Sequence, residues 1–200
     1  MPKLLIATNN KGKVNEIQDL LKDIGIELVT PNEIGIKLDV EEDGNTYAEN
    51  AEKKALAFAQ ASGLIALADD SGLEVDALNG APGLYSNRYL SKPNATEADR
   101  RAYLLKNLKD HPRPWSATFH ATIAIAVPND PSVRFATGEC KGEIIPEERG
   151  SGGFGYDPIF FIPEATHTMA ELSMEEKNRL SHRAHAVMNA KPILKEVFGF

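Results

Sequence analysis

The chain has 200 residues, of which 42% are hydrophobic and 26% charged, and this length and composition are typical of a single globular domain over residues 1–200. The formal net charge of −7 argues against a nonspecific nucleic-acid binder, which would usually be basic, but is compatible with a local basic pocket for one nucleotide. The single cysteine, Cys140, excludes an intrachain disulfide and a multi-cysteine zinc site, and no apolar stretch has the length of a signal peptide or a membrane span, so we expect a cytoplasmic protein.

Strand and helix patterns alternate through the first third of the chain. Short apolar runs predict buried strands, and apolar residues that recur every three to four positions predict amphipathic helices. The segment Asp69-Asp70-Ser71-Gly72 has the composition of a turn and should close the last of these strands. This alternation is typical of an α/β protein. The predicted elements are strands over residues 3–7, 26–30 and 64–68 and helices over 14–24 and 47–61.

The rest of the chain predicts a long hairpin between two helices. Alternating polar and apolar residues indicate a half-buried strand, and a polar turn should connect it to its partner. Hairpins that follow an alternating first part predict a mixed sheet. The predicted elements are a helix from Thr96 to about Leu108, strands over residues 116–127 and 132–145, and a C-terminal helix that Ser181 caps and Pro192 kinks or restarts.

A polar segment, Thr-Asn-Asn-Lys-Gly-Lys, lies where the first strand should meet its helix. Backbone amides at a helix N-terminus bind anions, and the two lysines add positive charge. The segment lacks the Walker A pattern, and the alternative interpretation is a polar helix cap with solvated lysines. The residues of this candidate anion-binding loop are Thr8, Asn9, Asn10, Lys11, Gly12 and Lys13.

Two carboxylates, Asp69 and Asp70, follow a buried strand, which is a common position for metal ligands in open α/β sheets. Ser71 adds a hydroxyl group, and the acidic run 41–43 could supply further oxygen ligands. Magnesium prefers a few carboxylates together with substrate phosphate and water. The alternatives are a plain polar turn for the aspartates and a solvated loop for the acidic run.

The most informative segments are SGGFGYDP at residues 151–158 and EEKNRLSHR at 175–183. Glycines let the first segment approach a ligand closely. Its aromatic rings could stack on a base, and its carboxylate could accept hydrogen bonds from that base. The second segment gathers cations that suit phosphates. A tight hairpin turn is the alternative for the first segment. The candidate ligand residues are Phe154, Gly155, Tyr156, Asp157, Lys177, His182 and Arg183.

Taken together and in this order, the motifs resemble the inosine triphosphate pyrophosphatases, also called dITP/XTP pyrophosphatases. The resemblance covers nearly the whole chain, and the combination of GGFGYDP with SHR is highly specific. One departure is His185, where the family often has a basic residue, and it lies outside the functional residues. The matching segments are ATNNKGK at residues 7–13, ENAEKKA at 49–55, ADDSGLEVDAL at 68–78, GAPGLYSNRY at 80–89, GGFGYDPIF at 152–160, AEL at 170–172, EEKN at 175–178 and SHRAHA at 181–186.

The resemblance implies an α/β fold with a long central mixed sheet flanked by helices, two lobes with the active site in the cleft between them, and a homodimer. It also implies Mg²⁺-dependent hydrolysis of ITP, dITP and XTP to the monophosphate and pyrophosphate, which cleanses the nucleotide pool of deaminated purines. Asp70 would be the general base and, with Glu41, would bind magnesium. The substrate ligands would be Thr8–Lys13 and Lys177 at the triphosphate, Ser71, and Phe154–Asp157 with His182 and Arg183 at the base.

Two other functions remain open at this point: a pyrophosphatase for other nucleotides, such as modified pyrimidine triphosphates, and a nucleotide sensor without catalysis. The role of Arg183 is also open. Its guanidinium can only donate hydrogen bonds, so it would either read the 6-carbonyl of hypoxanthine and xanthine or bind phosphate.

Overall fold

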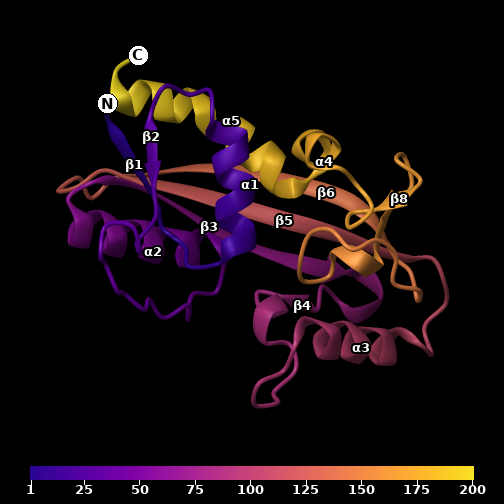
Figure 1. The fold of residues 1–200 in the computed structure, drawn as a ribbon. Helices are drawn as coiled ribbons and strands as arrows, with labels where there is room; N and C mark the ends of the chain where they lie inside the picture. The colour runs from indigo at the N-terminus through magenta and orange to yellow at the C-terminus, as the bar shows by residue number, and fades with distance from the viewer. The chain divides into compact units, whose positions relative to one another are not determined.

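The computed structural model describes all 200 residues (Figure 1). Its α-helices are α1 (Lys11–Leu21), α2 (Tyr47–Ser62), α3 (Glu97–Leu108), α4 (Met174–Leu180) and α5 (His182–Phe198). Its strands are β1 (Lys3–Ile6), β2 (Glu27–Val29), β3 (Ile65–Val75), β4 (Pro82–Gly83), β5 (Trp115–Ala126), β6 (Val133–Ile144), β7 (Phe160–Ile162) and β8 (His167–Thr168). Three short 3₁₀ helices span Asp76–Leu78, Ser86–Arg88 and Asp157–Ile159. No helix is both long and apolar enough to span a membrane.

The strands form one mixed sheet in the order β2-β1-β3-β5-β6-β7-β8, with β4 paired to β3, which confirms the predicted mixed α/β fold. Strand β1 is parallel to both of its neighbours, and its Leu5 is in register with Val29 of β2 and Ala66 of β3. The β3–β4, β6–β7 and β7–β8 pairs are antiparallel. Strand β1 ends at Ile6, opposite Leu67, so the loop that follows β1 begins beside the two aspartates of β3.

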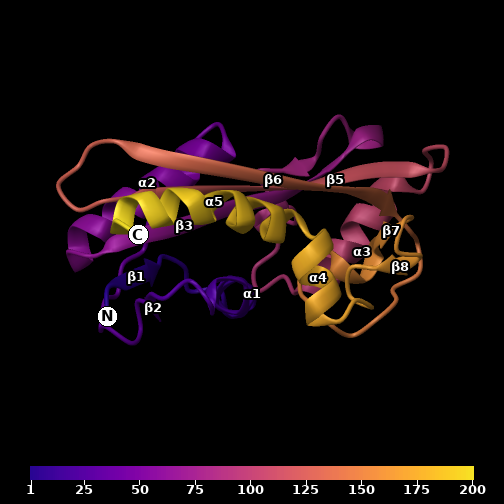
Figure 2. The same cartoon turned by 90° about the horizontal axis from the view of Figure 1, so that it is seen from above.

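The chain divides into two compact units, and the first comprises residues 1–71, 121–138 and 182–200. In this unit α1 and α5 pack on one face of the strands and α2 on the other (Figure 2). The cause is the two-residue period of β1: Leu4 and Ile6 belong to the core beneath α1 and α5, whereas Leu5 belongs to the core beneath α2.

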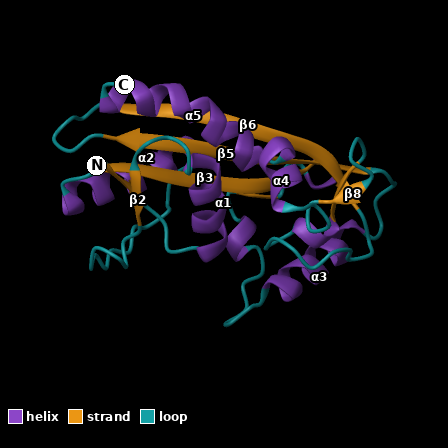
Figure 3. Ribbon diagram, turned by 45° about the horizontal axis from the view of Figure 1, so that its top comes forward, coloured by secondary structure: helices purple, strands orange, loops and turns teal.

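The second unit comprises residues 72–120 and 139–181 and contains α3, α4 and β8, which Figure 3 labels, together with the short strands β4 and β7. Its core is more aromatic than that of the first unit. Trp115, Phe119, Tyr156 and Phe160 are buried together, and the rings of Phe119 and Phe160 lie 4.5 Å apart. This core supports the turn that precedes β7.

The structure differs from the predicted fold in three details. Strand β3 does not end in a turn at Asp69–Gly72 but continues to Val75, because β4 pairs with it and buries Leu73. Of the two alternatives for Pro192, the restart is wrong, because this residue lies inside the continuous helix α5. Helix α4 was not expected, although its Ser173 forms a capping box with Glu176.

Candidate functional site

The loop after β1 is shaped by side chains that bond to its own backbone. The amide of Asn10 donates to Oγ1 of Thr8, and Oδ1 of Asn10 accepts from the amide of Lys13 as the N-cap of α1. The two lysines of the loop then differ in environment. Lys11 is exposed, whereas Lys13 is 6% exposed and points to the strands. Both lysines belong to the predicted anion-binding loop, and the structure shows that only Lys13 joins the buried face of α1.

Asp69 is the centre of a buried ion-pair network. Its Oδ2 lies 2.6 Å from Nζ of Lys13 and 3.3 Å from Nη2 of Arg183, whose Nη1 is paired with Glu16 and whose Nη2 also donates to Oγ of Ser71 at 3.0 Å. Burial acts to raise the pKa of Asp69, but the charges of Arg183 and Lys13 outweigh it and hold this pKa well below its usual range. Asp69 is therefore an ionised structural carboxylate.

Asp70 faces the opposite side of β3, because neighbouring residues of a strand alternate. Its Oδ2 accepts from Nδ2 of Asn50 at 3.1 Å, and its Oδ1 lies 3.7 Å from Nζ of Lys54, both on α2. Burial raises the pKa of Asp70, and the charges of Lys54 and Lys13 oppose this rise only in part. Of the two aspartates, Asp70 is thus the one whose raised pKa favours acceptance of a proton.

Two lysines meet beside these carboxylates from opposite faces of the sheet. Nζ of Lys13, from α1, and Nζ of Lys54, from α2, both donate to the backbone carbonyl of Asp69, at 3.4 and 2.7 Å. Burial lowers the pKa of Lys13, and Asp69 counteracts this by stabilising the charge. A polyanion that binds beside Asp69 and Asp70 would find two ammonium groups already in place.

Sequence reasoning did not assign roles to Asn50, Lys54 or Glu16. Asn50 and Lys54 are four residues apart on one face of α2, which is the helical spacing that could have revealed them. The acidic run 41–43 reaches α2 through Glu42. Glu41 is exposed, and it is Glu42 that pairs with Lys54. The charge of Glu42 contributes to the raised pKa of Asp70.

The structure gathers no group of three or more histidine, cysteine or acidic side chains that could hold a metal ion by themselves. Magnesium does not need such a group, because it is commonly held by one or two carboxylates with phosphate oxygens and water. Asp70 fits this chemistry, since its carboxylate is destabilised by burial and a cation would relieve it. The residues present therefore fit a magnesium ion that binds together with a phosphorylated substrate.

His182 and Arg183 occupy the first turn of α5, which rests directly on β6. A Cβ atom at Gly138 of β6 would lie 2.3 Å from the carbonyl oxygen of His182 and 2.3 Å from the amide nitrogen of Ala186. Only glycine allows this approach, and so Gly138 sets the position of both predicted ligands. His182 is 4% exposed, and Arg183 is 2% exposed. The network around Asp69 engages the guanidinium of Arg183, which favours a positioning role over direct reading of a base.

The other predicted ligands, Phe154–Asp157 and Lys177, lie in the second unit. Oδ2 of Asp157 accepts from Nζ of Lys177 at 2.7 Å and from the amide of Phe154 at 3.1 Å. The same ammonium lies 5.3 Å from the centre of the Phe154 ring. Gly153 has a φ of +71°, and a Cβ there would lie 2.1 Å from Oδ2 of Asp157, so the turn requires glycine.

Two further contacts fix this turn. Tyr156 is 5% exposed, and its hydroxyl donates to the carbonyl of Ser86 at 2.8 Å, so its ring belongs to the core and only Phe154 keeps a partly accessible ring for stacking. Arg101 of α3 donates from Nη1 to the carbonyl of Gly155 at 2.8 Å, and a bidentate pair with Glu148 holds its guanidinium. The turn is therefore tied down from two sides.

The first unit provides a buried carboxylate with a raised pKa and two convergent ammonium groups, and the second unit provides a rigid glycine–aromatic turn. The sequence model of the Ham1 family matches residues 4–193. The chain belongs to the Ham1 family. A dITP/XTP pyrophosphatase of Desulforamulus reducens is 51% identical to this Ham1-family protein over 98% of this chain and 97% of the relative.

Solved structures agree with this membership. A HAM1 protein from Coxiella burnetii has a TM-score of 0.88 to this Ham1-family protein at 43% identity, covering 98% of this chain and 100% of that chain. The Ham1 protein of Staphylococcus aureus has a TM-score of 0.84 to this chain at 37% identity, and the match covers 98% of this chain and 99% of that chain. The resemblance of the sequence motifs and the fold class are both confirmed.

Proposed function

We propose that this Ham1-family protein is a nucleoside-triphosphate pyrophosphatase that hydrolyses the noncanonical purine nucleotides ITP, dITP and XTP to the monophosphate and pyrophosphate. The observation that carries the proposal is the position of Asp70, a carboxylate with a raised pKa beside the buried ammonium group of Lys54. Full-length relatives named dITP/XTP pyrophosphatase support the substrate class.

In this proposal Asp70 accepts a proton from the water that attacks the α-phosphorus. Asn50 donates to its Oδ2 and thereby fixes the orientation of the carboxylate. Lys13 and Lys54 neutralise the phosphate chain, and their attraction grows as negative charge develops on the departing pyrophosphate. The loop Thr8–Lys13 contributes amides and the exposed Lys11 to the same chain.

Magnesium, when bound, would neutralise phosphate oxygens and make the phosphorus more electrophilic. We propose Asp70 as its principal carboxylate ligand and Glu41 as the second one. Glu41 lies on an exposed part of the chain, and its neighbour Glu42 is paired with Lys54, so the second ligand depends on how the acidic run rearranges around substrate.

We further propose that Phe154–Asp157, with His182, enclose the base. The partly accessible ring of Phe154 supplies a stacking surface. Hydrogen-bond donors that face position 6 of the purine would donate to the carbonyl oxygen of hypoxanthine or xanthine, whereas the amino group of adenine would leave these buried donors unpaired. Lys177 would bind phosphate from its place beside Asp157, and Ser71 would contact the substrate while it accepts from Arg183.

The decisive experiment is to incubate the protein with ITP and Mg²⁺, identify the products by ³¹P NMR, and repeat the reaction with ATP, with GTP and without metal. We expect IMP and pyrophosphate, a requirement for Mg²⁺, and much slower turnover of ATP and GTP. Formation of IDP and orthophosphate would mean that the wrong phosphorus has been assigned. Binding of ITP without turnover would instead support a nucleotide sensor.

Two finer assignments complete the proposal, and the first of them rests on the family resemblance. We propose a homodimer, which light scattering coupled to size-exclusion chromatography would test. We also propose a cytoplasmic location, in keeping with a lone buried cysteine, Cys140, whose pKa burial raises to about 12.

A further inference from the structure

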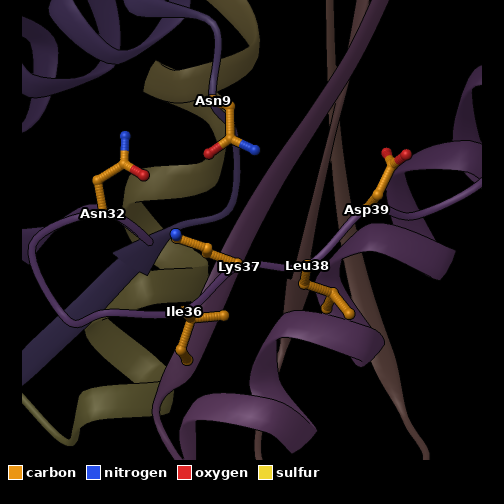
Figure 4. Close-up of a pocket in the computed structure, with 6 residues that line it drawn as sticks. All are labelled: Asn9, Asn32, Ile36, Lys37, Leu38 and Asp39. Atoms are coloured by element: carbon orange, nitrogen blue, oxygen red, sulfur yellow. The ribbon is translucent and has the colours of Figure 1, made fainter.

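A pocket of about 500 Å³ with both polar and apolar lining residues lies next to the candidate anion-binding loop in the first unit (Figure 4). This volume lies within the range of small-molecule sites. Asn9 forms one side of the pocket, and the rest comes from the segment after β2. The lining residues are Asn9, Asn32, Ile36, Lys37, Leu38 and Asp39.

The topology explains why these segments meet. Strands β1 and β2 are parallel, so the residues that follow them start from the same edge of the sheet. Asn9 directly precedes Asn10, the N-cap of α1, whose helix carries Lys13 to the carboxylates of β3. A phosphate chain that lies on the loop therefore has this pocket at one end.

The four polar side chains of the pocket have no polar partner within the protein. Asn9, Asn32, Lys37 and Asp39 form no side-chain hydrogen bond or ion pair. In Figure 4 the amide groups of Asn9 and Asn32 and the ammonium group of Lys37 are grouped on one side, and the carboxylate of Asp39 lies apart from them. The ammonium group and the two side-chain amides are hydrogen-bond donors, which suit phosphoryl oxygens.

We propose that this pocket is a subsite for the terminal phosphates of the substrate and for the pyrophosphate product, with Lys37 as its cation. The inference rests on the proposed function, because it assumes that a triphosphate lies along Thr8–Lys13. Lys37 and the two amides donate to phosphoryl oxygens, and Asp39 limits the affinity so that the product can leave. None of these contacts involves the base, so the pocket acts on the phosphate chain alone.

The test measures binding of inorganic pyrophosphate, with Mg²⁺, by titration calorimetry to the wild-type protein and three variants. Lys37→Ala should raise the Kd about three- to tenfold, as loss of an exposed charge-assisted contact does. Asp39→Asn should lower the Kd about two- to threefold, because it removes a nearby like charge. Lys195→Ala removes an exposed lysine of α5 that does not line the pocket, and it should leave the Kd unchanged.

Raising the ionic strength should reduce the differences in Kd between the variants and the wild type, because the charges of Lys37 and Asp39 are exposed. Pyrophosphate that fails to bind the wild type, or that binds Lys37→Ala and Lys195→Ala equally, would overturn the subsite. The two proposals fail separately. A protein that hydrolyses ITP but shows no effect of Lys37→Ala loses only the subsite, whereas one that binds pyrophosphate through Lys37 without hydrolysing ITP loses only the proposed function.

Discussion

Replacing Asp69 and Asp70 separately by asparagine should separate stability from catalysis. The two residues are neighbours in β3, yet they face opposite sides of the strand and have pKa values shifted in opposite directions. Each variant changes one oxygen to an amide nitrogen, so the side chains keep nearly the same size. The pair is therefore a matched comparison of two carboxylates.

Asp69→Asn should destabilise the fold. The side chain is fully buried between Lys13 and Arg183, and removing its charge leaves both cations without their shared partner. Breaking a buried ion pair in this way costs about 3–5 kcal/mol. For a chain of this length that lowers Tm by roughly 6–20 °C, against a total stability of about 5–15 kcal/mol.

Asp70→Asn should leave stability equal to or above that of the wild type and lower kcat at least ~10²-fold. Because burial raises the pKa of Asp70, the native state binds its proton more tightly than the unfolded state does. The wild type therefore loses stability as the pH rises from the ordinary carboxyl value, about 3.9, through the raised one. The asparagine variant has no such loss at neutral pH.

The sign is opposite for Asp69, whose lowered pKa stabilises the native state above about pH 3.9 and loses that effect as the pH falls below it. Thermal unfolding followed by circular dichroism at pH 7 and near pH 4, together with kcat/KM for ITP, checks both variants. The Tm difference between Asp69→Asn and the wild type should be largest at neutral pH. An Asp69→Asn variant that melts within ~2 °C of the wild type at pH 7, or an active Asp70→Asn variant, would refute the reasoning.

Two further variants test how the candidate ligands are positioned. Gly138→Ala should push the first turn of α5 off β6, because the new methyl would lie 2.3 Å from the carbonyl oxygen of His182. We expect kcat/KM for ITP to fall roughly tenfold or more and the free energy of unfolding to fall by about 1–3 kcal/mol. Steady-state rates at wild-type level would show that the helix tolerates the methyl. Arg101→Ala should remove the hydrogen bond to the carbonyl of Gly155, which is worth about 1 kcal/mol. We expect KM for ITP to rise a few-fold with little change in kcat, as measured by steady-state kinetics. A drop in kcat alone would count against a role of Arg101 in holding the turn.

Much of the fold could be read from the sequence because its signals are local. The helix over residues 47–62 and the hairpin of β5 and β6 follow from apolar periodicity and turn residues. The end of β3 could not be read in this way. Asp69 and Asp70 look like turn residues, and only cations from α1, α2 and α5 make a charged strand interior tolerable.

The candidate site shows the same limit. The loop after β1 and the glycine–aromatic turn were visible as motifs, since a few adjacent residues carry the chemistry. The partners of Arg183 could not be recognised from the sequence, because Glu16 lies 167 residues away along the chain and Asp69 lies 114 residues away. The burial of Lys13 was also missed. Its helical spacing from the buried Ile17 and Leu20 is the pattern that could have distinguished it from the exposed Lys11.

The ion pair between Lys177 and Asp157 has a consequence for how a ligand would be sensed. Oδ2 of Asp157 accepts from both Lys177 and the amide of Phe154, so a phosphate that draws Lys177 away makes this carboxylate a stronger acceptor. Such coupling is reciprocal: a group that donates to Asp157 loosens Lys177 and raises its affinity for phosphate. The two ends of a nucleotide would then bind cooperatively, and the intact molecule would bind more tightly than its separate base and phosphate chain predict.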